Sequence, residues 1–442
     1  MCGIVGAIAE RNVTPILLEG LRRLEYRGYD SAGIVTLDGR DDRLHRVRTV
    51  GKVQALADRL RQGPVRGSLG LAHTRWATHG EPSERNAHPH VSGDSVAVVH
   101  NGIIENYQEL KAKLIAAGYQ FASDTDTEVV AHLIDQHLRG NGGDLLAAVR
   151  QSVARLTGAY SLGVICREDP ERLIAARAGS PLVLGIGIEE HFIASDVFAL
   201  APVTQSFIFL EEGDVAEVQR ERFAIYDRDG RAVERPLSYS GQMGGAAGKG
   251  GYRHFMLKEI FEQPAVVAET LEGRIHQGRL LEDSFGPEAG PLFEQARGVH
   301  IVACGTSYHA GLVARYWLEN LGVPCTVEVA SEYRYRHGVT PPGTLFVSIS
   351  QSGETADTLA ALRAARERGY LSTLTICNVA ESSLVRESAL TLLTRAGREI
   401  GVASTKAFTT QLVALRLLAL MLGRRRGLNE SDEAVLVRDL EL

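Results

Sequence analysis

The residue with the clearest chemical potential in this chain is Cys2, in the opening Met1-Cys2-Gly3-Ile4-Val5-Gly6. Once the initiator Met is removed, Cys2 carries a thiol with an ordinary pKa of about 8.5 and an α-amino group with a pKa of about 8. The amine can take the thiol proton, directly or through one water, as in enzymes whose N-terminal residue is the nucleophile. The alternative interpretation is a small buried residue at the start of a strand.

Two further segments contain groups that a thiol nucleophile needs. His100-Asn101-Gly102 follows the apolar run 96–99, so we expect it where a strand ends. The Asn amide and the Gly N–H could form an oxyanion hole, or the pair could be an Asn-Gly hairpin turn. Segment 73–80, His-Thr-Arg-Trp-Ala-Thr-His-Gly, also follows a predicted strand. There Arg75 could hold a carboxylate with two N–H groups, and Trp76 could close over a pocket or belong to the core.

An acidic segment supplies a possible partner for an ammonium group. Segment 123–128, Ser-Asp-Thr-Asp-Thr-Glu, is typical of a helix N-terminus, with capping residues and acids in the first turn. A carboxylate here could also bind an α-ammonium group. A cation and an anion for the two ends of a free amino acid, with a thiol and oxyanion donors for its side-chain amide, together describe glutamine hydrolysis.

Two loops in the C-terminal part are rich in hydroxyl groups. Ser350-Gln351-Ser352-Gly353-Glu354-Thr355 runs from the apolar strand 344–350 into a predicted helix at 356–368, and Cys304-Gly305-Thr306-Ser307 repeats the arrangement after 299–303. Small hydroxyl residues and Gly before a helix N-terminus are typical of a phosphate site. Open α/β sheets also bind ligands at the carboxyl ends of their strands. Alternatively, these Ser and Thr residues only cap their helices. The sequence has no G-x-x-x-x-G-K-[ST], which disfavours a nucleotide-hydrolysing P-loop.

The elements that must position these residues fall into two parts, separated by the glycine-rich segment 241–251. Before it, many short strands with a few helices predict two stacked sheets flanked by helices, an α+β arrangement. After it, strands alternate with helices, which predicts a parallel doubly wound sheet. The predicted strands are 4–9, 32–37, 69–73, 96–100, 161–166, 173–176, 182–185 and 207–210, then 299–303, 326–329, 344–349, 372–377 and 390–394; the predicted helices of the first part are 13–23, 107–117, 127–139 and 144–156.

Composition excludes several classes of protein. The 442 residues are 44% hydrophobic and 23% charged, enough for two or three domains, and a net charge of −6 with mixed signs does not favour nucleic acid. Five scattered cysteines without C-x-x-C, and histidines without H-E-x-x-H spacing, predict neither a disulfide framework nor a metal site. The apolar segment 411–423 is too short to span a membrane, and no leader is recognised. We therefore expect a cytoplasmic protein.

The N-terminal motifs, which include Glu25–Gly33, resemble a class II glutamine amidotransferase domain. More narrowly, they resemble the glutaminase half of the glutamine–fructose-6-phosphate aminotransferases (isomerizing), the glucosamine-6-phosphate synthases. The resemblance implies an N-terminal-nucleophile four-layer sandwich at 2–219, followed by an extension and glycine-rich linker at 220–251, and it implies no cofactor and no metal. The roles it implies are nucleophile for Cys2, oxyanion hole for Asn101 and Gly102, binding of the glutamine carboxylate and amine for Arg75 and Asp126, pocket lining for Thr78 and His79, control of ammonia transfer for Trp76, and support of the N-terminus for Arg27.

The C-terminal loops resemble the first sugar isomerase (SIS) domain of the same family, an α/β doubly wound domain at 289–430. Family members continue with a second SIS domain and a tail, on the order of another 150 residues. We therefore expect this sequence of 442 residues to be C-terminally truncated and to keep only the glutaminase half of the activity. Lys406 is interpreted as structural, because the imine-forming lysine of the family lies near the C-terminus. The fructose-6-phosphate-binding residues that the resemblance implies are Thr306, Ser307, Ser350, Gln351, Ser352, Thr355, Val402 and Ser404.

The expected function is therefore that of an enzyme. Cys2 hydrolyses glutamine, and the ammonia is delivered to fructose-6-phosphate to form glucosamine-6-phosphate, a precursor of UDP-N-acetylglucosamine, and glutamate. The resemblance implies a homodimer when full-length, with no nucleic-acid or membrane partner. Two alternatives stay open: an amidotransferase with another acceptor, such as a phosphoribosyl donor, and a sugar-phosphate-sensing SIS regulator. The first lacks an acidic phosphoribosyl-diphosphate loop after residue 251, and the second leaves the Cys2 motifs unexplained.

Overall fold

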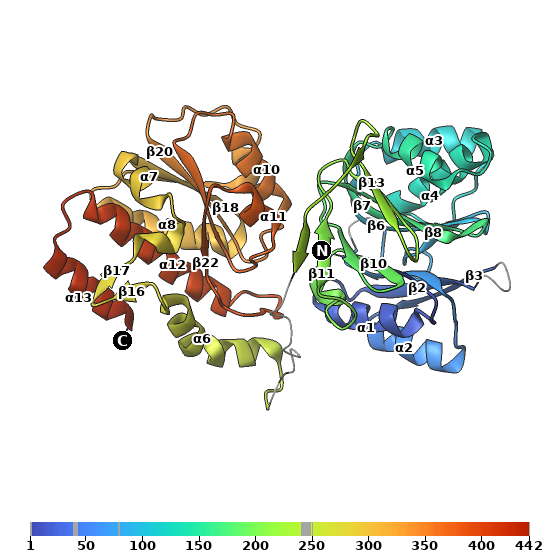
Figure 1. Cartoon of the computed structure of the whole chain (residues 1–442), viewed down its shortest axis with the longest axis horizontal. Coiled ribbons are helices and arrows are strands. Elements are labelled where there is room, and N and C mark those ends of the chain that lie inside the picture. Colours follow the sequence, from blue (N-terminus) through green and yellow to red (C-terminus); the bar gives the residue numbers. More distant parts are fainter. Residues whose placement is uncertain (1, 39–42, 78–79, 240–248, 250, 442) are drawn as a thin grey trace. The chain divides into compact units, whose positions relative to one another are not determined.

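The computed structural model describes residues 2–38, 43–77, 80–239, 249 and 251–441 (Figure 1). The chain forms two compact units, Met1–Gly245 and Ala246–Leu442. Each unit has its own sheets and its own hydrophobic core.

The first unit is built on two antiparallel sheets. In spatial order the eight-stranded sheet contains β15 (Leu237–Tyr239), β11 (Ser206–Phe209), β9 (Val183–Ile186), β10 (Glu190–Ala194), β1 (Gly3–Ala9), β4 (Leu69–Arg75), β2 (Ser31–Asp38) and β3 (Arg43–Val50). The seven-stranded sheet contains β14 (Ala232–Val233), β13 (Phe223–Tyr226), β12 (Val215–Val218), β8 (Asp169–Ala178), β7 (Gly158–Cys166), β6 (Val96–Ile104) and β5 (His90–Ser92). The helices are α1 (Thr14–Leu24), α2 (Val53–Gln62), α3 (Tyr107–Ala116), α4 (Asp126–Gly140) and α5 (Leu145–Val153), with 3-10 turns at Glu25–Arg27 and Val197–Ala199.

The first unit has four layers, because each sheet packs against the other sheet with one face and against helices with the other. Ile4 of β1 and Leu71 of β4 pack against Val99 of β6 in the core between the two sheets. Val5, the next residue of β1, faces the other way and packs with Leu17 of α1, as the period of two in a strand requires. The far face of the seven-stranded sheet is covered by α3, α4 and α5 (Figure 1). The predicted α+β four-layer sandwich is confirmed.

Strand β6 corrects one expectation from the sequence. The strand does not end at His100 but continues to Ile104, and Asn101 pairs with Ser161 of β7 in the ladder. The hairpin-turn alternative for Asn101-Gly102 is therefore wrong. The predicted helix N-terminus is also formed differently, because the Thr125 side chain makes no capping hydrogen bond to α4 within the described part of the chain.

The second unit is a parallel doubly wound sheet, as predicted. Its strand order is β19 (Cys325–Val329), β18 (Gly298–Ala303), β20 (Thr344–Ser350), β21 (Ser372–Cys377) and β22 (Leu390–Leu393), and neighbouring strands pair in parallel. Its helices are α6 (Phe255–Leu271), α7 (Ala289–Gln295), α8 (Gly305–Asn320), α9 (Ala330–Tyr333), α10 (Ala356–Ala365), α11 (Ser383–Glu387), α12 (Lys406–Arg424) and α13 (Glu430–Glu441), with a 3-10 turn at Glu282–Phe285 and a hairpin of β16 (Ile275–His276) and β17 (Arg279–Leu280). Residues of α8 and α12 share one core with the sheet, and α9 and α10 share another.

Helix α12 is longer than the apolar segment in the sequence suggests. Its 19 residues are long and apolar enough to cross a membrane, but 78% of its most apolar 18-residue window is buried inside the unit. Its first residue, Lys406, is buried and its Nζ lies 2.8 Å from Glu262 of α6. A central core helix explains both the composition and the burial, and the ion pair agrees with a structural role for Lys406.

Candidate active site

Several of the side chains predicted to act on glutamine come from strands of the two facing sheets and lie in the layer between them. Along β4, Leu69 and Leu71 face this layer, so His73 and Arg75 face it too. Along β6 the odd-numbered residues face it, which places Asn101 opposite β4. The same alternation along β1 directs Cys2 into the end of this layer.

Hydrogen bonds with Trp76 and Asn101 hold Cys2 at this end. The backbone N–H of Trp76 donates to Cys2 Sγ at 3.2 Å, and Asn101 Nδ2 donates to the backbone carbonyl oxygen of Cys2 at 3.1 Å. Burial raises the pKa of the Cys2 thiol, while the Trp76 hydrogen bond, the N-terminal charge and Arg75 oppose that rise. A thiol with a raised pKa needs a base before it can attack a carbonyl.

Gly102 occupies a position that a side chain could not. Its φ is +134°, and a Cβ there would lie 1.9 Å from the backbone oxygen of Ala159 in β7. Glycine is therefore required for β6 and β7 to stay paired at this point. Asn101 and Gly102 thus form a rigid part of the sheet next to Cys2.

The two predicted glutamine-binding charges are fixed by the backbone around them. Arg75 is buried and donates to the carbonyl oxygens of Gly80 at 3.2 Å and Glu81 at 3.4 Å. Burial lowers its pKa, which the charges of Cys2, Asp30 and Asp126 oppose. Asp126 is the first residue of α4, and its Oδ2 accepts the N–H of Ile104 at 2.9 Å. A cation and an anion are therefore both held near the Cys2 end of the layer.

The loop after β4 is anchored by a residue that the sequence analysis did not single out. Asp30 Oδ2 accepts the N–H of Ala77 at 2.8 Å. Trp76 is 37% exposed and meets Tyr29 edge-on at 5.4 Å, so the alternative of a core Trp is wrong. Asp30 could have been found from the sequence, because it is an acidic residue within the motif Glu25–Gly33. Thr78 and His79 lie outside the described residues.

Arg27 is buried and forms an ion pair. Its Nη2 is 2.6 Å from Asp196 Oδ2, which also accepts from the Tyr26 hydroxyl at 2.9 Å. Burial disfavours the charge, but Tyr26 and Asp196 more than offset this and raise the pKa of Arg27. Ser195, next in the chain, accepts the N–H of Ile4 at 3.0 Å. Arg27 is thus linked, through Asp196 and its neighbour Ser195, to the strand that follows Cys2.

The two hydroxyl loops of the second unit follow the carboxyl ends of β18 and β20, which are neighbours in the sheet. Ser350 Oγ accepts the N–H of Gly353 at 3.0 Å and lies 3.0 Å from the Thr355 hydroxyl. Within the described residues, neither Thr355 nor Cys304 makes a side-chain capping bond to the helix it precedes. The capping alternative therefore does not account for these loops.

The remaining predicted sugar-phosphate residues differ in their exposure. Ser307 is buried and Thr306 is exposed at the start of α8, while Gln351 and Ser352 are half-buried. Val402 is 75% exposed in the loop before α12. In the same loop the Ser404 hydroxyl donates to Glu399 Oε2 at 2.9 Å.

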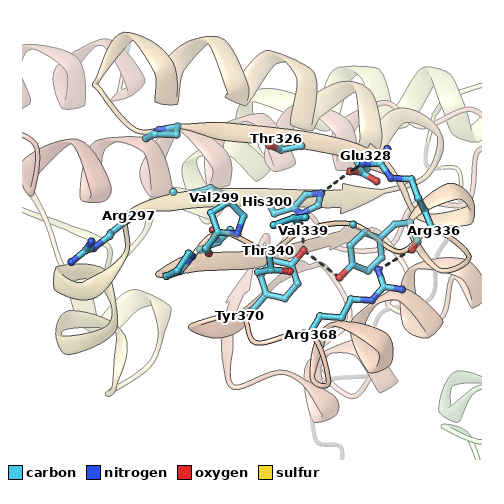
Figure 2. Close-up of a pocket in the computed structure, with 17 residues that line it drawn as sticks. Arg297, Val299, His300, Thr326, Glu328, Arg336, Val339, Thr340, Arg368 and Tyr370 are labelled. Atoms are coloured by element: carbon cyan, nitrogen blue, oxygen red, sulfur yellow. Dashed lines mark hydrogen bonds and ion pairs between the residues drawn. The ribbon is translucent and has the colours of Figure 1, made fainter.

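A cavity of about 330 Å³ in the second unit lies away from these loops (Figure 2). Its lining includes Gly298 and Thr344, the first residues of β18 and β20, whereas the hydroxyl loops follow the other ends of these strands. Its polar groups bind one another: His300 Nδ1 lies 2.7 Å from the Tyr370 hydroxyl, and Arg336 pairs with Glu328 at 3.2 Å. No predicted site residue lines it. Among the described residues, no cluster of His, Cys, Asp or Glu could hold a metal ion.

The sequence matches two families and close relatives along its length. Residues 73–202 match the glutamine amidotransferase domain family, and residues 292–421 match the SIS domain family. The glutamine–fructose-6-phosphate aminotransferases (isomerizing) of Pseudomonas aeruginosa and Idiomarina loihiensis are 61% and 59% identical over all of this chain, which spans 72% of their length. The solved C-terminal domain of glucosamine-fructose-6-phosphate aminotransferase from Francisella tularensis is 52% identical over 44% of this chain and 55% of its own, with a TM-score of 0.43. Identity at this level along the whole chain shows that it belongs to the glutamine–fructose-6-phosphate aminotransferase (isomerizing) family.

Proposed function

We propose that this chain hydrolyses glutamine at Cys2 and that the ammonia is delivered to fructose-6-phosphate, giving glucosamine-6-phosphate and glutamate. The observation that carries the proposal is the contact between Asn101 Nδ2 and the carbonyl oxygen of Cys2, at 3.1 Å. It brings a side-chain amide donor to the residue that bears the thiol, where an oxyanion would develop. Family membership supports the same reaction.

The glutaminase step follows from these groups. The α-amine of processed Cys2, directly or through a water, takes the thiol proton, and the thiolate sulfur attacks the side-chain carbonyl carbon of glutamine. The negative charge that develops on the carbonyl oxygen is stabilised by Asn101 Nδ2 and the N–H of Gly102. The C–N bond breaks as the amine returns its proton to the leaving nitrogen, which departs as ammonia. Water then hydrolyses the thioester and releases glutamate.

The two ends of the substrate are bound by opposite charges. Arg75 binds the α-carboxylate, exchanging its hydrogen bonds to the carbonyls of Gly80 and Glu81 for a charged acceptor. Asp126 binds the α-ammonium group with its carboxylate. Trp76, exposed on the loop beyond Arg75, covers the site when glutamine is bound.

The second unit supplies the phosphosugar site. The hydroxyls of Ser350, Ser352 and Thr355 lie between the end of β20 and the start of α10, and those of Thr306 and Ser307 lie in the first turn of α8, where backbone N–H groups favour a phosphate. Cysteines without disulfides among the described residues support a reducing, cytoplasmic location. We propose a homodimer on the family resemblance alone.

The test is glutamate release from glutamine by the purified chain, measured with and without fructose-6-phosphate. Cys2→Ala should abolish release, because it removes the nucleophile and hardly changes the side-chain volume. Cys166→Ala is the matched control, since Cys166 is a buried thiol of β7 outside the site. Substantial glutamate release by Cys2→Ala would refute the assignment.

A further inference from the structure

We propose that His73 is a positioning residue for the glutaminase reaction. Its ring holds the carboxamide of Asn101 in the one orientation that presents an N–H, rather than an oxygen, to Cys2. The inference rests on the proposed function, because it assumes that Asn101 stabilises the oxyanion.

The contacts of His73 join the two sheets of the first unit. His73 lies on β4 of the eight-stranded sheet and is fully buried. Its Nε2 lies 3.0 Å from the backbone oxygen of His100 and 2.9 Å from Asn101 Oδ1, both on β6 of the other sheet. One ring nitrogen therefore meets two oxygens of adjacent residues.

The backbone contact determines which ring nitrogen carries the proton. A carbonyl oxygen only accepts hydrogen bonds, so Nε2 must donate to His100 and must carry a hydrogen. A donor at Nε2 requires an acceptor from Asn101, which places Oδ1 against the ring and Nδ2 on the other side. The carbonyl oxygen of Cys2, 3.1 Å from Nδ2, demands the same orientation independently. A flipped amide would set donor against donor and acceptor against acceptor in a buried site.

His73 acts as a neutral donor rather than as an acid or base. Burial lowers its pKa to about 3, and the nearby His100 and Arg75 disfavour a second proton as well. Its Nδ1 has no hydrogen-bond partner among the described residues, and its ring stacks on His88 at 4.1 Å between centroids. The ring is thus fixed by stacking on its face and by two acceptor oxygens at Nε2. Its effect on catalysis should be independent of pH in the range where the enzyme is assayed.

The expected effects separate positioning from general structural support. His73→Leu removes the donor and frees the Asn101 amide, which should lower kcat about ten- to a hundred-fold, less than the loss of about 10²–10³ typical when an oxyanion donor itself is removed. KM for glutamine should change less than about three-fold, because the donor acts on charge that develops in the transition state. His73→Gln places an amide N–H at a similar reach and should recover most of kcat. His191→Leu is the matched control, since His191 is also buried and contacts a backbone oxygen, that of Gln219, at 2.8 Å.

The experiment is a double-mutant cycle on glutamate release. If His73 acts through Asn101, His73→Leu should cost nothing further in an Asn101→Ala background. Equal fold-losses in both backgrounds, or an unchanged kcat in His73→Leu, would overturn the proposal. Nitrogen-15 NMR of the wild-type histidines gives a second test that needs no variant to fold: the Nδ1–H tautomer or an imidazolium at His73 at pH 7 would also overturn it. Failure of the proposed function is distinguishable, because the wild-type chain would then release no glutamate.

Discussion

Gly102→Ala should separate the fold of the first unit from its catalysis. The added methyl would lie 1.9 Å from the Ala159 oxygen, 2.7 Å from its carbonyl carbon and 3.0 Å from Tyr160 Cα, all of them backbone atoms of β7. Side-chain movement cannot relieve these contacts, so β6 must move away from β7 by about 1 Å or more. A shift of that size in a catalytic group costs on the order of 10² in rate. Together with a misplaced oxyanion donor, the expected loss in kcat is about 10²–10³, or roughly 3–4 kcal/mol of transition-state stabilisation.

The stability cost of Gly102→Ala is expected to be smaller and separately measurable. A residue other than Gly at a φ of +134° costs about 1–3 kcal/mol, and the lost strand pairing adds to this. Gly142→Ala is the control, because Gly142 also has a positive φ of +74° but a Cβ there would contact nothing within 4 Å. It should lower Tm slightly and leave kcat unchanged. A kcat of Gly102→Ala within two-fold of wild type, with the chain folded, would refute the role of this backbone in the oxyanion hole.

Three other perturbations test the binding groups and the helix that carries Asp126. Arg75→Lys should raise KM for glutamine about ten- to a hundred-fold, because an ammonium cannot reproduce the two-pronged contact with a carboxylate; an unchanged KM would contradict the assignment. Ser350→Ala should weaken fructose-6-phosphate binding about two- to ten-fold by calorimetry, and equal affinities would argue against the loop as a phosphate site. Burial disfavours the charge on Glu128, but hydrogen bonds from His132, Ala122 and Ser123 lower its pKa to about 2 from 4.5. Its contribution to stability is therefore full above about pH 4.5 and lost as pH falls towards 2, and Glu128→Gln should flatten that part of the unfolding profile.

Local sequence predicted most of the fold and the outline of the site. The predicted strands appear where a short run of apolar and small residues is buried, as in β1 and β20, which are buried at every position. In the first unit the helix α2 and the strands β3, β5, β10 and β12 to β15 were not predicted. Strand β3 pairs only with β2 at the edge of its sheet, and its sequence RLHRVRTV contains three arginines. Because only one of its residues is buried, its sequence shows no clear apolar pattern. The continuation of β6 beyond His100 was missed because Asn-Gly favours a turn locally, whereas pairing with β7 over the whole strand overrides that preference.

The role of His73 could not be predicted from spacing, since it depends on the alignment of two sheets. Residues 73 and 101 belong to different sheets, and their contact exists only because β4 and β6 present their odd-numbered residues to the same layer. A shift of one residue in the pairing of β4 would turn His73 and Arg75 towards α1 and α2 and leave Asn101 without its donor. The hydrophobic residues Leu69 and Leu71 prevent that shift, because their burial between the sheets fixes the face of every residue on the strand. The same apolar pattern that stabilises the sandwich therefore also sets the position of the Asn101 amide that we propose to be catalytic.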